Sequence, residues 1–153
     1  MIDQPPTTLA PGDVLDEVSF DVEAGKIREF ARATHAADPV HTSPDAAARA
    51  GFDAPVATAT HVVVAGHHRD QKAFVAALGM DITRIVVGSV TWEYHRPLVA
   101  GDHLTGTRRV HSDTTKEGRR GGTMRLVELE TTWTGHDGPI ATQRETLIER
   151  GAE

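Results

Sequence analysis

Residues 58–78 read TATHVVVAGHHRDQKAFVAAL, and this stretch decides the fold. Its apolar runs, Val62–Ala65 and Phe74–Leu78, occupy more than one side of a helix, a pattern typical of a helix that is buried all round. The pattern predicts one long helix over about 58–78, although Gly66 weakens helix formation near its middle. Other parts of the chain must bury such a helix.

Four segments after this helix are rich in Val, Thr, Trp and Tyr, residue types that favour strands. Gly135-His136-Asp137-Gly138 is a hairpin signal, so the last two segments should be adjacent and antiparallel. In the first segment, period-two alternation predicts that Val86, Val90, Trp92 and Tyr94 share one face. The four predicted strands are 82–94, 103–114, 123–134 and 140–149.

The N-terminal part is predicted to contain a strand and two shorter helices. Alternation favours a strand over 14–22, and a period of three to four residues favours a helix from Ala24 to about 36–38, before Pro39. Ser43 is a suitable helix cap and Pro44 a suitable first residue, so a short helix is expected over 44–50.

This order of elements predicts an α+β fold, because the helices are segregated from a meandering antiparallel sheet. A curved antiparallel sheet wrapped around a long central helix is the hotdog fold. We expect an N-terminal tail over 1–12 and a single hotdog domain over 13–150. The open sheet edge would need covering, which a dimer that extends the sheet would provide.

Length and composition exclude several classes of function. The 153 residues suffice for one domain, and a net charge of −6 disfavours nucleic-acid binding. The chain has no cysteine, which excludes thiolate catalysis and cysteine zinc sites, and no long apolar span that would suggest a membrane protein. We therefore expect a cytoplasmic protein. We interpret the basic cluster, which comprises Arg108, Arg109, Lys116, Arg119 and Arg120, as a solvated hairpin.

Of the nine histidines, His41 is the best candidate for chemistry. It lies in the tight loop between the first two predicted helices, beside Asp38-Pro39. It either satisfies backbone groups in that turn or serves as a general base beside a carboxylate. His67 and His68 are adjacent on a predicted helix and point in different directions, so no metal site is expected.

Several stretches together resemble the MaoC-like hydratase and dehydratase family of hotdog proteins. Asp38-Pro39-Val40-His41 resembles the family motif Asp-x-Asn-Pro-x-His, and Phe52-Asp53-Ala54-Pro55 resembles its Phe-x-x-Pro turn. Tyr94-His95-Arg96-Pro97, followed by Ala100-Gly101-Asp102, resembles the type-I-fatty-synthase-like dehydratase subgroup. The resemblance covers about Leu9 to Arg150.

The resemblance implies an enzyme that adds water to, or removes it from, an acyl thioester of coenzyme A or acyl-carrier protein. The 3-hydroxyacyl product of hydration would normally have the R configuration. No metal or redox cofactor is implied, because the substrate brings its own carrier. The family histidine maps onto His41 and the motif asparagine onto Asp38, whereas the family aspartate is replaced by Ala36.

The resemblance also implies where the thioester binds. The family glycine at the start of the central helix, whose N–H stabilises the thioester oxygen, corresponds to Ala59. Thr58 and Thr60 flank it and are candidates for substrate binding; the alternative role of Thr58 is to cap the helix. His67 falls where the family often has a polar residue facing the site.

Ala36 leaves three interpretations open: Asp38 replaces the missing carboxylate, His41 works alone, or a partner subunit supplies the catalytic pair. The protein would accordingly be a homodimer, or a heterodimer with another hotdog subunit. A hotdog thioesterase or cyclase is disfavoured, because residues 58–69 contain no Asp or Glu to activate water.

Overall fold

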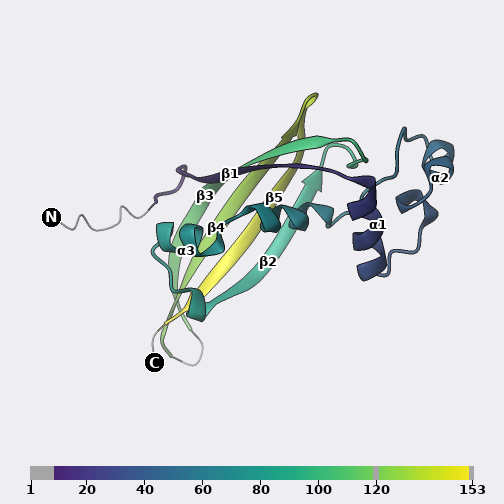
Figure 1. Ribbon diagram of the computed structural model, residues 1–153. Coiled ribbons are helices and arrows are strands. Elements are labelled where there is room, and N and C mark those ends of the chain that lie inside the picture. The colour runs from purple at the N-terminus through teal and green to yellow at the C-terminus, as the bar shows by residue number, and fades with distance from the viewer. Residues whose placement is uncertain (1–8, 119–120, 152–153) are drawn as a thin grey trace.

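The computed structural model describes residues 9–118 and 121–151, which form one five-stranded sheet with helices on one side and beyond one end (Figure 1). All strand pairs are antiparallel and the strand order is β1-β3-β4-β5-β2. The α+β hotdog prediction is confirmed. The strands are β1 (Val14–Asp21), β2 (Ile85–Tyr94), β3 (His103–Glu117), β4 (Thr123–Gly135) and β5 (Gly138–Arg150).

The central helical segment crosses one face of the sheet, but it is not the continuous helix that the apolar runs predicted. It consists of a 3₁₀ segment, η2 (His61–His68), and an α-helix, α3 (Gln71–Ala77). The break has a local cause, because the Asp70 carboxylate accepts a hydrogen bond from the Ala73 N–H at 2.9 Å and starts a new helix. The β-branched valines and Gly66 in η2 also disfavour a regular α-helix.

The helices α1 (Ala24–Ala33) and α2 (Pro44–Arg49) lie beyond one end of the sheet, joined by a short 3₁₀ turn, η1 (Pro39–His41) (Figure 1). Helix α1 ends earlier than predicted, and His35 follows it with a φ of 57°. Helix α2 begins as predicted, because the Ser43 hydroxyl accepts a hydrogen bond from the Ala46 N–H. These turns place His41 beside the start of the central segment.

The four C-terminal strands lie where the sequence predicted them, with two differences in β2. The strand begins only at Ile85, because Asp81 caps a 3₁₀ turn, η3 (Ile82–Arg84). A bulge between Val87 and Ser89 then shifts the alternation, so that Val87 lies opposite the buried Leu147. The prediction that Val86 shares a face with Trp92 is therefore wrong, and Val87 takes that place.

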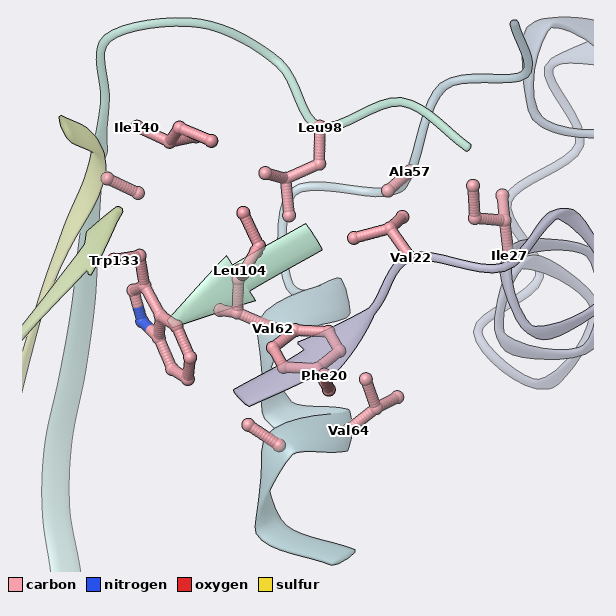
Figure 2. Packing of buried hydrophobic residues seen from close by; sticks show 12 residues of the cluster. Phe20, Val22, Ile27, Ala57, Val62, Val64, Leu98, Leu104, Trp133 and Ile140 are labelled. Atoms are coloured by element: carbon pink, nitrogen blue, oxygen red, sulfur yellow. The ribbon is translucent and has the colours of Figure 1, made fainter. Parts of the chain in front are cut away.

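The apolar core is divided into two clusters on the inner face of the sheet. The larger one packs η2 against Phe20, Leu104 and Trp133, as Figure 2 shows, with the Phe20 and Trp133 rings edge to face at 5.6 Å. The smaller one packs α3 against the other ends of the strands. Its fully or mostly buried members are Val75, Leu78, Met80, Val110, Val127, Leu129 and Leu147.

One residue of the basic cluster is not on a solvated hairpin, as the sequence had suggested. Arg108 lies between the two apolar clusters and is only 3% exposed, because its side chain points to the inner face of β3. Arg109, its neighbour, is exposed on the outer face. Arg119 and Arg120 lie outside the described residues, as do residues 1–8 of the predicted tail. Residue 12 of that tail is hydrogen-bonded to β3 through the Val110 carbonyl.

The packing of Trp133 depends on a glycine opposite it. A Cβ atom at Gly106 would lie 2.3 Å from the Trp133 ring, so Gly106→Ala should lower the free energy of unfolding by about 2–3 kcal/mol. Gly66→Ala is the control, because a Cβ there meets no atom within 4 Å. It should be neutral or stabilise by about 0.5 kcal/mol. Urea unfolding measures both, and equal stability of the two variants would contradict this account of the core.

Candidate active site

Two of the predicted site residues, Thr58 and Ala59, line a hollow of about 370 Å³ just before the central segment. One wall is the chain from Val56 to Ala59, and the other is formed by Tyr94, at the end of β2, and the residues that follow it as far as Leu98. The two walls are held together by hydrogen bonds from the Ala57 N–H to the Leu98 carbonyl at 2.8 Å, and from the Tyr94 hydroxyl to the Ala59 carbonyl at 2.5 Å. Burial raises the pKa of Tyr94 to about 12, so the phenol keeps its proton and remains a donor.

His41 is attached to this wall through a single hydrogen bond. Its Nδ1 lies 2.7 Å from the carbonyl oxygen of Val56. A carbonyl only accepts, so Nδ1 carries the proton in the neutral ring and Nε2 keeps its lone pair. The Val56 N–H in turn donates to the Val40 carbonyl at 3.0 Å, which fixes η1 against the same residue. The arrangement presets the tautomer that a general base at Nε2 requires.

The carboxylate of Asp38 already has a structural task. Its Oδ1 accepts a hydrogen bond from the Val40 N–H at 2.9 Å and caps η1. Asp38 is exposed, and its hydrogen bond with His41 is a backbone one, from the His41 N–H to the Asp38 carbonyl at 3.2 Å. Within the described residues, its carboxylate makes no hydrogen bond to the imidazole. Ala36, at the position of the family aspartate, is half-buried and brings no polar group.

The chain at Thr58–Thr60 offers backbone donors to the hollow. Among residues 9–118 and 121–151, the N–H groups of Ala59 and Thr60 have no hydrogen-bond acceptor, and Ala59 lines the hollow. Thr58 does not cap η2, because its buried hydroxyl also lacks a partner in the described part of the chain. Free N–H groups at the start of a helical segment are suited to binding a negatively charged oxygen.

His67 is separate from this group. It is exposed near the C-terminal end of η2 and lines neither the hollow nor the cavity beneath the central segment. The structure thus places Thr58 and Ala59 in the wall of the hollow, with Thr60 next in the chain. It joins His41 to the same wall through Val56, and it leaves His67 outside.

Arg96 and Asp102, from the sequence motif Arg96-Pro97…Gly101-Asp102, form an ion pair, and the role of this pair is structural. Its guanidinium donates two hydrogen bonds to Asp102, at 2.8 and 2.9 Å, and two more to Asp137 in the β4–β5 hairpin. These bonds raise the pKa of Arg96 and lower that of Asp137. The clamp fixes the end of β2 and with it one wall of the hollow.

His61 is a residue that sequence reasoning missed. It is fully buried at the start of η2, edge to face with Phe30 at 5.4 Å, and neither ring nitrogen has a partner among the described residues. Burial, and secondly the positive charge of Lys26, lower the pKa of His61 to about 4. The available signal was its position directly before the apolar run Val62–Ala65, because a residue adjoining a buried run is often buried with it.

Comparison with known proteins agrees with this architecture. Residues 10–143 match the family model described as the FAS1-like dehydratase domain region. The chain belongs to this family. It is 36% identical over 134 residues to a UPF0336 protein of Saccharopolyspora erythraea, which covers 87% of this chain and 83% of that protein. A UPF0336 protein of Mycobacterium tuberculosis is 30% identical over 130 residues, covering 84% and 75%.

Solved structures give the same fold. The HadBC complex of Mycobacterium tuberculosis, a 3R-hydroxyacyl-ACP dehydratase, aligns with a TM-score of 0.69 at 29% identity, over 85% of this chain and 90% of that one. A MaoC-like dehydratase aligns with a TM-score of 0.78 at 24% identity, over 95% and 43%. The resemblance to MaoC-like dehydratases is confirmed, and the family to which the chain belongs is a dehydratase family.

Two further properties concern only the part of the chain that is described. It contains no helix long and apolar enough to cross a membrane. In the same residues, no three side chains of His, Cys, Asp or Glu are gathered as the ligands of a metal ion would be.

His61 predicts a dependence of stability on pH. Since its folded pKa of about 4 lies below the ordinary value of 6.5, the unfolded chain binds more protons between these values. The free energy of unfolding should therefore fall as the pH is lowered from 6.5 towards 4, by on the order of 3 kcal/mol from this group.

The measurement is urea unfolding across this pH range for the wild type and His61→Leu. The variant should lose this part of the pH dependence, whereas His136→Leu, at a side chain that is 93% exposed, should retain it. Parallel curves for wild type and His61→Leu would contradict the prediction.

Proposed function

We propose that the chain forms a hydratase or dehydratase of acyl thioesters, carried by coenzyme A or acyl-carrier protein, in which His41 is the general acid and base. The observation that carries the proposal is the hydrogen bond from Nδ1 of His41 to the carbonyl of Val56, a residue that lines the hollow. This bond leaves the lone pair of Nε2 available. Family membership supports the reaction class.

The reaction needs one proton to be moved from water to carbon. In hydration, Nε2 of His41 would take a proton from water as the water oxygen bonds to the β-carbon of the enoyl group. The imidazolium would then return a proton to the α-carbon, and dehydration would follow the same steps in reverse. The substrate brings its own carrier, so the proposal includes no resident cofactor.

The negative charge that develops on the thioester oxygen would be stabilised by backbone N–H groups. Ala59 and Thr60 present such donors at the start of the central segment, and Ala59 lines the hollow. The Tyr94 hydroxyl, by binding the Ala59 carbonyl, would keep this peptide in place. Thr58 and Thr60 are the flanking substrate-binding residues of the proposal. His67 has no part in it, because it lies outside the hollow.

A second hotdog subunit is part of the proposal. β2 lies at one edge of the sheet, and its Val86 and Val87 side chains are 44% and 61% exposed. Pairing with another subunit along this edge would cover both. Ala36, and the involvement of Asp38 in capping η1, favour a heterodimer in which the partner brings the missing carboxylate. Retention of His41 favours a homodimer that is active by itself.

Removal of the His41 imidazole tests the proposal directly. His41→Ala should lower the rate of crotonyl-CoA hydration about 10²- to 10⁴-fold, because the proton acceptor is lost. The rate is followed by the loss of absorbance of the conjugated thioester. His136→Ala, at an exposed turn, is the control and should keep the wild-type rate. Unchanged turnover in His41→Ala would overturn the assignment of His41.

Because position 36 has alanine in place of the family aspartate, restoring the aspartate is a gain-of-function test. Ala36→Asp should raise the hydration rate at least about tenfold if the purified chain catalyses with His41 alone, because the family pair would be restored. Ala37→Asp, at the adjacent exposed residue, is the matched control and should have no effect. A chain that gains nothing from Ala36→Asp, yet becomes active when mixed with a second hotdog subunit, would identify the partner as the catalytic chain.

A further inference from the structure

A second cavity, of about 240 Å³, lies beneath the central segment, between η2 and α3 on one side and the inner face of the sheet on the other. Its walls are mainly apolar and include both tryptophans of the chain, Trp92 and Trp133. Two of its lining residues, Val63 and Val87, are 46% and 61% exposed, so the cavity opens at the β2 edge.

The floor of this cavity is polar. The strand registers place Asp16, Arg108, Thr131, Gln143 and Trp92 opposite one another in one row across all five strands. Of this row, Arg108, Gln143 and Trp92 line the cavity. The side chains of this row occupy the inner face. The neighbouring row on one side is apolar, and the row on the other side is apolar except for Glu145. The row lies between the two apolar clusters. Its polar side chains therefore interrupt the core and do not lie on the surface of the protein.

Charged side chains complete the floor. Arg108 donates to Asp16 through Nε and Nη2 and to Glu145 through Nη1 at 2.9 Å, and its guanidinium lies 4.1 Å from the centre of the Phe74 ring. Arg69, from the end of η2, donates to Asp16 through Nη1 at 3.1 Å. The two arginine side chains are 4% and 8% exposed. Two cations and two carboxylates give the floor a net charge near zero.

Hydrogen-bonding capacity remains unused on this floor. Within the described residues, only Nη1 of the Arg69 guanidinium meets an acceptor, and the group has five N–H donors. Burial and the charge of Arg108 lower the pKa of Arg69, and the carboxylates of Asp16 and Glu145 oppose this shift. The Gln143 side chain accepts from the Trp133 indole at 3.2 Å through Oε1, which leaves its amide NH₂ as a further donor.

Such a floor discriminates between ligands by hydrogen bonding. A methyl group pushed against it would remove water from buried donors without replacing the lost hydrogen bonds, which is unfavourable. A hydroxyl or carbonyl oxygen would accept from the same donors. A carboxylate suits the floor less well, because Asp16 and Glu145 already balance the two arginines.

The cavity is placed to receive the chain of a thioester bound in the candidate active site. Trp92 lines the cavity, and Tyr94, two residues along the same face of β2, lines the hollow beside Ala59. Two residues of a strand span about 7 Å. We infer that this cavity selects acyl chains that carry a neutral oxygen, as a hydroxyl or keto group, at the end remote from the thioester. The identification of the ligand as an acyl chain rests on the proposed function.

The test compares saturated ω-hydroxyacyl-CoA thioesters of increasing length with alkyl analogues in which a methyl replaces the hydroxyl. Because both tryptophans line the cavity, their fluorescence reports binding without turnover. At the best length, the hydroxylated thioester should bind at least about tenfold more tightly than its methyl analogue. Equal affinity, tighter binding of the methyl analogue, or a preference for an ω-carboxylate would overturn the inference.

Substitutions at Arg69 and Gln143 test whether these residues cause the preference for the hydroxylated thioester. Arg69→Met should reduce it to near unity, whereas Arg144→Met, on the same sheet but at an exposed position of β5, should leave it unchanged. Gln143→Leu removes the second donor and should weaken the preference in part, which serves if Arg69→Met does not fold. A preference that survives both Arg69→Met and Gln143→Leu would overturn the assignment to this floor.

Hydration of crotonyl-CoA, whose chain is too short to carry a remote oxygen, reports the proposed function separately. If the protein hydrates crotonyl-CoA but binds the hydroxylated and methyl thioesters equally well, only the inference about the cavity is overturned, and the proposed function stands. A hydroxyl preference without hydration, alone or with a partner subunit, would overturn the proposed catalysis and leave the cavity as a binding site. Absence of both would overturn both.

Discussion

The ion pairs of Arg108 and Arg69 with Asp16 and Glu145 are the constraint around which the rest of the inner face is arranged. They join β1, β3 and β5 to the end of the central segment, and they separate the two apolar clusters. Buried ion pairs are costly to form, and apolar residues of similar volume often stabilise a core equally well. Their presence beneath a cavity therefore fits a role in binding. The Arg69–Asp16 pair lies at the junction of η2 and α3, where the Asp70 cap starts the new helix.

The candidate active site depends on backbone groups more than on side chains. The Val56 carbonyl sets the tautomer of His41, the Leu98 carbonyl and the Tyr94 hydroxyl hold the wall at Ala57–Ala59, and the Arg96 clamp holds the opposite wall. A change of side chain at Ala36 or Ala59 leaves this frame intact. The frame is thus compatible with a chain that catalyses alone and with one that shares its site with a second hotdog subunit.

Much of this could be predicted from local patterns. Alternating apolar residues and hairpin glycines identified the strands, and the caps Ser43 and Pro44 identified α2. The failures occurred where a tertiary contact or an irregularity overrides local preference. Asp70 and the Arg69–Asp16 pair divide the predicted central helix, and the bulge before Ser89 exchanges the faces of Val86 and Val87. The burial of Arg108 and of His61 was also missed, because the type of a charged or polar residue does not reveal whether its side chain faces the core or the solvent.

By itself, the sequence determined the fold class, the family resemblance and the position of His41 in a loop between helices, because these follow from periodicity, caps and short motifs along the chain. The tertiary structure alone decided which nitrogen of His41 is free, which peptide N–H groups have no acceptor, and that Asp16, Arg108, Thr131 and Gln143 form one row under the helix. The physical reason is that each of these properties depends on strand register and on hydrogen bonds between residues far apart in the chain.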